Sequence, residues 1–162
     1  MREPPVLGIV GASGAGKTTL LEYLLRKLTA EGRRVGTLKH HPEPLETDRQ
    51  ESDTFKHRVA GSLATWLLTP GLGTLWTAGI GPEEAVRRLV RAFPELDLIL
   101  IEGFKTGSWP RLLVRRPGDE DFGLPEVAAV YGEAPPGFGG PVWTAPEEVL
   151  RWVRSFLVEG SV

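Results

Sequence analysis

The sequence predicts an α/β fold, a doubly wound and mostly parallel sheet with helices on both faces. The main support is an alternation along the chain between short apolar runs, typical of strands, and segments with helical periodicity. A glycine-rich turn joins the first of these strands to the first helix. The continuous Leu/Ile run at 96–101 indicates a strand that is buried on both faces, as the central strands of a parallel sheet are.

The first half of the chain begins with a strand at 6–10, where the residues are apolar, and a helix at 17–30, where leucines recur at helical spacing. A second strand is expected at 34–39. It is followed at 40–52 by a polar segment rich in proline and acidic residues, and then by a helix at 53–61.

The second half continues the alternation. Pro82 opens a helix with acidic residues in its first turn, and Pro146 opens a last amphipathic helix. Strands are expected where apolar and β-branched residues lie between turn signals, at 64–69, 73–78, 96–101, 111–115 and 127–131.

The turn after the first strand carries a phosphate-binding motif. Residues Gly11 to Thr18 fit G-x-x-x-x-G-K-[ST], with a strand before them and a helix after them, so the predicted fold is of the P-loop NTPase type. Glycines allow positive φ and bring backbone N–H groups close to phosphate oxygens, and the helix start adds partial positive charge. We expect Lys17 to reach the β- and γ-phosphates and the Thr18 hydroxyl to bind Mg²⁺. The expected nucleotide-binding residues of this loop are Gly11, Ala12, Ser13, Gly14, Ala15, Gly16, Lys17, Thr18 and Thr19.

A carboxylate ends the buried strand that should lie beside the first one. In P-loop proteins such a carboxylate holds Mg²⁺ directly or through water, so Glu102 is a candidate metal ligand and catalytic residue. Lys105, which follows closely, is a candidate phosphate contact or an ordinary surface lysine. Asp97, at the other end of the strand, is expected to cap or begin it.

The charged segment after the second strand is a candidate nucleotide-responsive loop, because that strand end should face the phosphates. Asp48 and Asp53 are its candidate ligands for Mg²⁺ or its waters. His40 and His41 are adjacent, and side chains adjacent on a strand point to opposite faces. We therefore expect no metal ion to be shared by the two histidines.

Composition narrows the class of protein. The 162 residues are expected to form one P-loop nucleotide-binding domain over 1–162. A net charge of −2 gives no broad basic surface, so no nucleic-acid partner is expected. No apolar stretch is long enough to span a membrane and the N-terminus lacks a signal-peptide core, so we expect a cytoplasmic protein without a membrane partner. There is no cysteine, which removes disulfides and thiolate sites.

Several short motifs in this order resemble one known family, that of the molybdopterin-guanine dinucleotide biosynthesis adaptor protein (MobB). The resemblance covers roughly residues 5–132. The motifs that carry it are the phosphate loop, Lys39-His40, Asp48, Asp53-Thr54, Lys56, Ala60-Gly61, Glu102-Gly103-Phe104-Lys105 and the following "RLLVRR".

The resemblance implies a GTP- and Mg²⁺-binding adaptor in molybdenum cofactor (molybdopterin guanine dinucleotide) biosynthesis. It further implies weak Mg²⁺-dependent GTP hydrolysis, a homodimer, and assistance to the guanylyltransferase of that pathway. The chain departs from the family pattern at Pro42 and Glu43, where a second histidine pair is usual, and at Glu51, which replaces a usual glycine.

The residues themselves leave the base and the class of protein open. The N/T-K-x-D signature that reads guanine is not present. Glu133, just after the expected strand at 127–131, is a candidate acceptor for hydrogen bonds from guanine N1 and N2, or an ordinary solvated loop carboxylate. A P-loop small-molecule kinase is an alternative, with Arg111, Arg115 and Arg116 as a clamp on the transferred phosphoryl group. The other is a metallochaperone-type GTPase, which would need a metal-ligand cluster.

Overall fold

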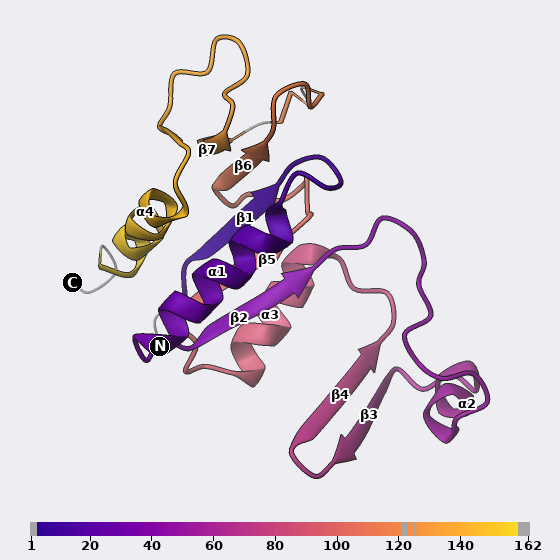
Figure 1. Cartoon of the computed structure of the whole chain (residues 1–162). Helices are drawn as coiled ribbons and strands as arrows, with labels where there is room; N and C mark the ends of the chain where they lie inside the picture. Colours follow the sequence, from indigo (N-terminus) through magenta and orange to yellow (C-terminus); the bar gives the residue numbers. More distant parts are fainter. Residues whose placement is uncertain (1–2, 121–122, 125, 159–162) are drawn as a thin grey trace.

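A six-stranded parallel sheet forms the centre of the molecule (Figure 1). The computed structural model describes residues 3–120, 123–124 and 126–158. The sheet has the order β2-β5-β1-β6-β7-β8, and every neighbouring pair is parallel. Its strands are β1 (Val6–Val10), β2 (Val35–Lys39), β5 (Leu98–Glu102), β6 (Arg111–Arg115), β7 (Val127–Gly132) and β8 (Val142–Trp143). Because β1 is central and the chain extends from it to both edges, the sheet is doubly wound, and the predicted fold class is confirmed.

Helices cover both faces of this sheet. The helices packed on it are α1 (Lys17–Ala30), α3 (Pro82–Ala92) and α4 (Pro146–Val158). Leucines of α1 and apolar residues of α4 share one core cluster with Leu7, Leu98 and Leu100 of the sheet. Ile99 and Ile101 alternate with these leucines and pack on the other face against Val86 of α3. The unbroken apolar run of β5 follows from this two-sided burial.

A helix and a hairpin stand apart from the sheet and project from the body of the molecule (Figure 1). They are α2 (Asp53–Val59), β3 (Ala64–Thr69) and β4 (Leu72–Thr77), and β3 and β4 form a separate two-stranded antiparallel sheet. We call residues 53–77 the arm. Segment 40–52 joins it to β2, and the contacts that fasten this segment to the arm include two side-chain pairs. Trp76 Nε1 donates to Thr47 Oγ1 at 2.9 Å, and Arg58 pairs with Glu46 at 2.6 Å.

Most predicted boundaries match the structure within two residues, and the differences have local causes. The central strand begins at Leu98, not at 96, because Asp97 pairs with Arg34 just before β2: its carboxylate accepts from the N–H of Arg34 at 2.8 Å, and its own N–H donates to the Arg34 carbonyl. The two-residue strand β8 was not predicted, since two residues carry no periodicity.

The topology brings the carboxyl ends of all the sheet strands to one edge, where the loop between β1 and α1 also lies. In parallel α/β sheets this edge is where ligands bind. Among the described residues, no helix is long and apolar enough to cross a bilayer.

Candidate nucleotide-binding site

The loop between β1 and α1 has the backbone that its glycines predict. Gly11, Gly14 and Gly16 have φ of 148°, 76° and 102°. At Gly11 a Cβ would lie 2.1 Å from the carbonyl oxygen of Val114, so only glycine fits between β1 and β6. Gly16 is the N-cap of α1 in the left-handed region, and the free N–H groups of the first turn therefore face the loop.

Lys17 lies at the start of α1 and curls back over this loop. Its Nζ donates to the carbonyl oxygens of Gly11 at 3.1 Å and Ala12 at 2.6 Å. Burial is the main cause that lowers the pKa of Lys17 below the ordinary lysine value; Glu102 opposes the shift, and the nearby Lys105 and Lys39 add to it. An anion in the loop would offset both the cost of burying this charge and its repulsion by the other lysines.

Glu102 stands at the end of β5 next to β1, where it was expected. Its side chain is buried, and Oε1 accepts a hydrogen bond from Thr18 Oγ1 at 2.9 Å. Lys39, its register partner on β2, places Nζ 3.7 Å from the same oxygen. The loop hydroxyl and the strand-end carboxylate thus converge at one point.

The loop faces a cavity of about 790 Å³. Besides loop residues, its lining includes Lys39, His40, His41, Glu102, Phe104, Lys105 and Arg116. The His40 ring stacks on Phe104 with ring centroids 4.4 Å apart, and the backbone N–H of His40 donates to the Glu102 carbonyl at 2.9 Å. A cavity lined by several cations and by backbone N–H groups suits a polyphosphate.

The expectation for the two histidines needs a correction. It placed His40 and His41 on a strand with opposite orientations, but β2 ends at Lys39 and both histidines line the same cavity. Within the described ranges, no group of three or more histidine, aspartate or glutamate side chains is arranged to hold a metal ion.

The structure does not bring Asp48 and Asp53 to this cavity. Both lie at the start of α2, where Asp48 Oδ1 accepts hydrogen bonds from Ser52 Oγ at 3.2 Å and from the N–H of Arg49 at 2.8 Å. Ser52 is in turn the N-cap of α2 and accepts from the Phe55 N–H. In this arrangement Asp48 organises the start of α2.

Of the remaining candidate residues, Lys105 lies at the site, whereas the three arginines proposed as a clamp lie in different places. Lys105 lines the cavity, whereas Arg111 is buried at the amino end of β6, where it donates to the Gly107 carbonyl. Arg116 follows the other end of β6 and comes within 3.7 Å of the position a Cβ would take on Gly16. The three arginines therefore do not converge as a clamp. Sequence reasoning listed Arg116 only for that clamp, and no local signal placed it beside the loop.

Comparison with known proteins gives consistent similarities. The family described as molybdopterin guanine dinucleotide synthesis protein B (MobB) matches residues 6–131. The chain is 36% identical over 125 residues to the molybdopterin-guanine dinucleotide biosynthesis adapter protein of Haemophilus influenzae, covering 76% of this chain and 69% of that protein. The Escherichia coli protein of the same name is 33% identical over 117 residues, covering 70% and 67%. The crystal structure of Bacillus subtilis MobB superposes with a TM-score of 0.72 at 27% identity, covering 94% of this chain and 97% of that one.

Proposed function

The chain belongs to the MobB family, and from this membership we propose that it is a GTP-binding adaptor protein of molybdopterin guanine dinucleotide biosynthesis. It would bind GTP with Mg²⁺, hydrolyse it slowly and assist the guanylyltransferase that uses GTP in this pathway. The observation that carries the proposal is the contact between Thr18 on the phosphate loop and the buried Glu102. We further propose that the protein acts in the cytoplasm, which holds the nucleoside triphosphates.

The residues at this contact fit Mg²⁺. A threonine hydroxyl and a carboxylate oxygen are the hard oxygen ligands that this ion takes in P-loop proteins, where phosphates and waters complete the coordination. When bound, the ion neutralises charge on the phosphate oxygens. Lys39 Nζ, 3.7 Å from Glu102 Oε1, is a further positive charge at this point. Asp48 and Asp53 would serve the metal only after segment 40–52 rearranged, so we assign the protein ligands to Thr18 and Glu102.

Hydrolysis by this site should be slow. Glu102 could orient an attacking water, but the residues that follow it are Gly103, Phe104 and Lys105, none of which positions water as the glutamine of fast GTPases does. Fast hydrolysis would in any case defeat an adaptor, which needs its nucleotide to persist until the partner is engaged.

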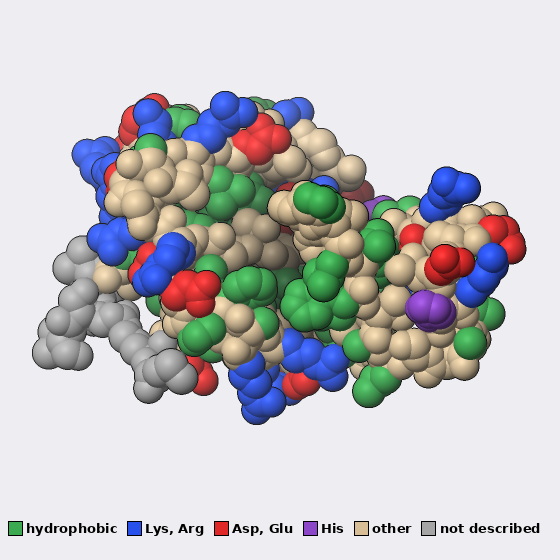
Figure 2. Space-filling model, turned by 90° about the horizontal axis from the view of Figure 1, so that it is seen from below, with side chains coloured by type: hydrophobic (Ala, Val, Ile, Leu, Met, Phe, Trp, Pro, Cys, Tyr) green, Lys and Arg blue, Asp and Glu red, His purple; other side chains and the backbone are tan. Residues whose placement is uncertain are grey.

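The arm supports the proposed homodimer. Trp66 and Leu75 are directly opposite one another in the hairpin, on the same face as Leu68, and these side chains are 63%, 53% and 70% exposed. Figure 2 shows hydrophobic side chains on the surface of this projecting part. An isolated two-stranded hairpin with an uncovered apolar face is marginal in water, so pairing with a second copy would stabilise it.

Calorimetric titration with GTP and with ATP, each with and without Mg²⁺, tests the nucleotide. GTP binding that strengthens with Mg²⁺ and exceeds ATP binding is expected, and failure to bind either nucleotide would refute the proposal. The partner is tested by binding of the purified guanylyltransferase to this protein with a non-hydrolysable GTP analogue, with GDP and without nucleotide. We expect tightest binding with the analogue, and no binding in any state would refute the adaptor function.

A further inference from the structure

Three lysines from separate elements meet at the edge of the sheet where the phosphate-binding cavity lies. Lys17 comes from the start of α1, Lys39 from the end of β2 and Lys105 from the chain after β5, and all three line the cavity. Burial lowers the pKa of Lys17 most, Glu102 opposes the shift, and the charges of Lys105 and Lys39 lower this pKa further. The three ammonium groups are thus close enough to repel one another, and an anion bound among them would stabilise all three.

The register of the sheet places Lys39. β2 pairs with β5 in parallel, and Lys39 lies directly opposite Glu102. The backbone is held here, because the N–H of the next residue, His40, donates to the Glu102 carbonyl oxygen at 2.9 Å. The Lys39 side chain has more freedom: it is 65% exposed, and its Nζ lies 3.7 Å from Glu102 Oε1. An ion pair this long, with an exposed lysine, stabilises little, so Lys39 can exchange the carboxylate for another anion at small cost.

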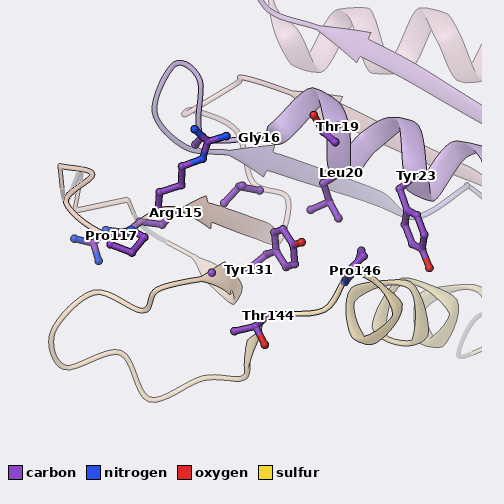
Figure 3. A pocket seen from close by; sticks show the side chains of 13 residues that line it. Gly16, Thr19, Leu20, Tyr23, Arg115, Pro117, Tyr131, Thr144 and Pro146 are labelled. Carbon is purple, nitrogen blue, oxygen red and sulfur yellow. The ribbon is translucent and has the colours of Figure 1, made fainter.

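A nucleotide has a preferred direction across this edge of the sheet. On the β6 side of the loop a second cavity, of about 470 Å³, adjoins the first, and Figure 3 shows Leu20 of α1 and Tyr131 of β7 pointing toward one another in it. Its mainly apolar lining suits the nucleoside half of a nucleotide and disfavours phosphate. The strand order β2-β5-β1-β6 puts Lys39 on the opposite side of β1. A phosphate chain that enters from the β6 side therefore ends nearest β5 and β2.

The end of such a chain meets the point where Thr18 and Glu102 converge. The backbone N–H groups of the loop and of the start of α1 suit the inner phosphates, which need no residue from β2. Thr18 Oγ1 donates to Glu102 Oε1 at 2.9 Å, and Lys39 Nζ approaches the same oxygen from the far side of β5. A diphosphate held in the loop stops short of this point. Lys39 is therefore positioned for the one phosphate that GTP has and GDP lacks.

We propose that Lys39 is the residue by which this site distinguishes a nucleoside triphosphate from a diphosphate. With a triphosphate bound, its ammonium group turns from Glu102 to the terminal phosphate, and with a diphosphate it stays beside Glu102. The inference rests on the proposed function, because it assumes that the loop binds a nucleotide, and it adds the residue that reads the nucleotide state. Lys39 directly precedes segment 40–52, which leads to the arm.

Calorimetric titration of a non-hydrolysable GTP analogue and of GDP, each with Mg²⁺, measures this discrimination. Lys39→Met removes the charge and keeps a long side chain, and Lys39→Arg, which keeps the charge, is its matched control. We expect Lys39→Met to weaken binding of the analogue about 10-fold, the lower end of the range for a hydrogen bond to a charged group, because the side chain is exposed. Its GDP affinity should change by less than about twofold, as for a screened charge without a direct contact. Lys39→Arg should keep the preference for the analogue.

Further variants separate a direct phosphate contact from other effects of the charge. Lys27 is exposed in the last turn of α1, so Lys27→Met should change the affinity for neither nucleotide. Lys105→Met tests the other lysine on this side of the cavity: selective loss of the analogue in Lys105→Met and not in Lys39→Met would overturn the assignment to Lys39.

A double variant tests whether Lys39 acts only by neutralising Glu102. In the Glu102→Gln background, Lys39→Met should still weaken the analogue selectively, because its contact is with the phosphate. If the selective effect vanished in that background, Lys39 would act through the carboxylate alone, and the inference would be overturned.

The outcomes distinguish the inference from the function on which it rests. A wild type that binds both nucleotides, with the two affinities unchanged or equally reduced in Lys39→Met, would overturn the role of Lys39 and leave nucleotide binding in place. A wild type that binds neither GTP nor ATP would overturn the proposed function and the inference with it.

Discussion

Replacement of Lys17 by alanine tests the phosphate cradle most directly. A unit charge about 4 Å from a phosphate charge, at an effective dielectric constant near 20, is worth about 4 kcal/mol. The Lys17 Nζ donates to the carbonyl oxygens of Gly11 and Ala12, and exchanging these two bonds for phosphate contacts costs about 2 kcal/mol net, about 1 kcal/mol for each bond. The difference of about 2 kcal/mol predicts roughly 30-fold weaker binding of GTP.

The assay is calorimetric titration of Mg²⁺–GTP and of inorganic tripolyphosphate, with circular dichroism to verify folding. Arg26→Ala is the matched control, because Arg26 is exposed on the same helix and its loss also removes one positive charge. We expect Lys17→Ala to weaken both ligands and Arg26→Ala to weaken neither by more than about twofold, the effect of a screened surface charge. A folded Lys17→Ala variant with wild-type affinity would refute the assignment of this loop as the phosphate site.

Three further predictions concern turnover, pH and assembly. Glu102→Gln, which keeps the shape but removes the charge facing Thr18, should lower GTP hydrolysis about 10- to 1,000-fold with a smaller loss of GTP affinity, and unchanged phosphate release would contradict a catalytic role. Because burial lowers the pKa of Lys17 below the ordinary lysine value of 10.5, its ammonium group loses its proton at a lower pH than an exposed lysine does. Tripolyphosphate affinity should therefore decline as the pH rises toward 10.5. The Lys17→Arg variant, whose side chain stays charged, should show a smaller decline. Trp66→Glu or Leu68→Glu should convert a dimer to a monomer in sedimentation velocity, because each variant would bury a charge in the proposed interface. A dimer that stays unchanged would show that this face of the hairpin is not the interface.

The parts of the fold that local sequence determines were predictable. The backbone of the loop between β1 and α1 was predictable, because Gly11, Gly16 and Lys17 owe their positions to positive φ and to the start of a helix, both local properties. The place of Glu102 at the end of β5 was predictable because a buried apolar run followed by a carboxylate is also a local pattern.

Features that depend on contacts between distant segments were not predictable. The hairpin has the alternation of an ordinary strand pair, and nothing within it signals that it leaves the main sheet. Arg116 comes beside Gly16 only because β6 pairs with β1, and Asp48 lies away from the site because Ser52 caps α2 and retains it there. The composition of segment 40–52 suggested a phosphate-facing loop, but of this segment only His40, His41 and Pro42 line the cavity beside the loop between β1 and α1.

Segment 40–52 nevertheless joins the two parts that an adaptor needs. Its first residues, His40 and His41, line the phosphate cavity, and a few residues later Glu46 and Thr47 hold Arg58 and Trp76 of the arm. The segment between these contacts is short and mostly exposed, so it has few other bonds to resist a shift at either end. We propose that a bound phosphate would act, through His40 and His41, on the same stretch of chain that fixes the apolar hairpin. In a protein whose proposed task is to present a nucleotide state to a partner, this connection gives the state a route to the surface that does not pass through the sheet.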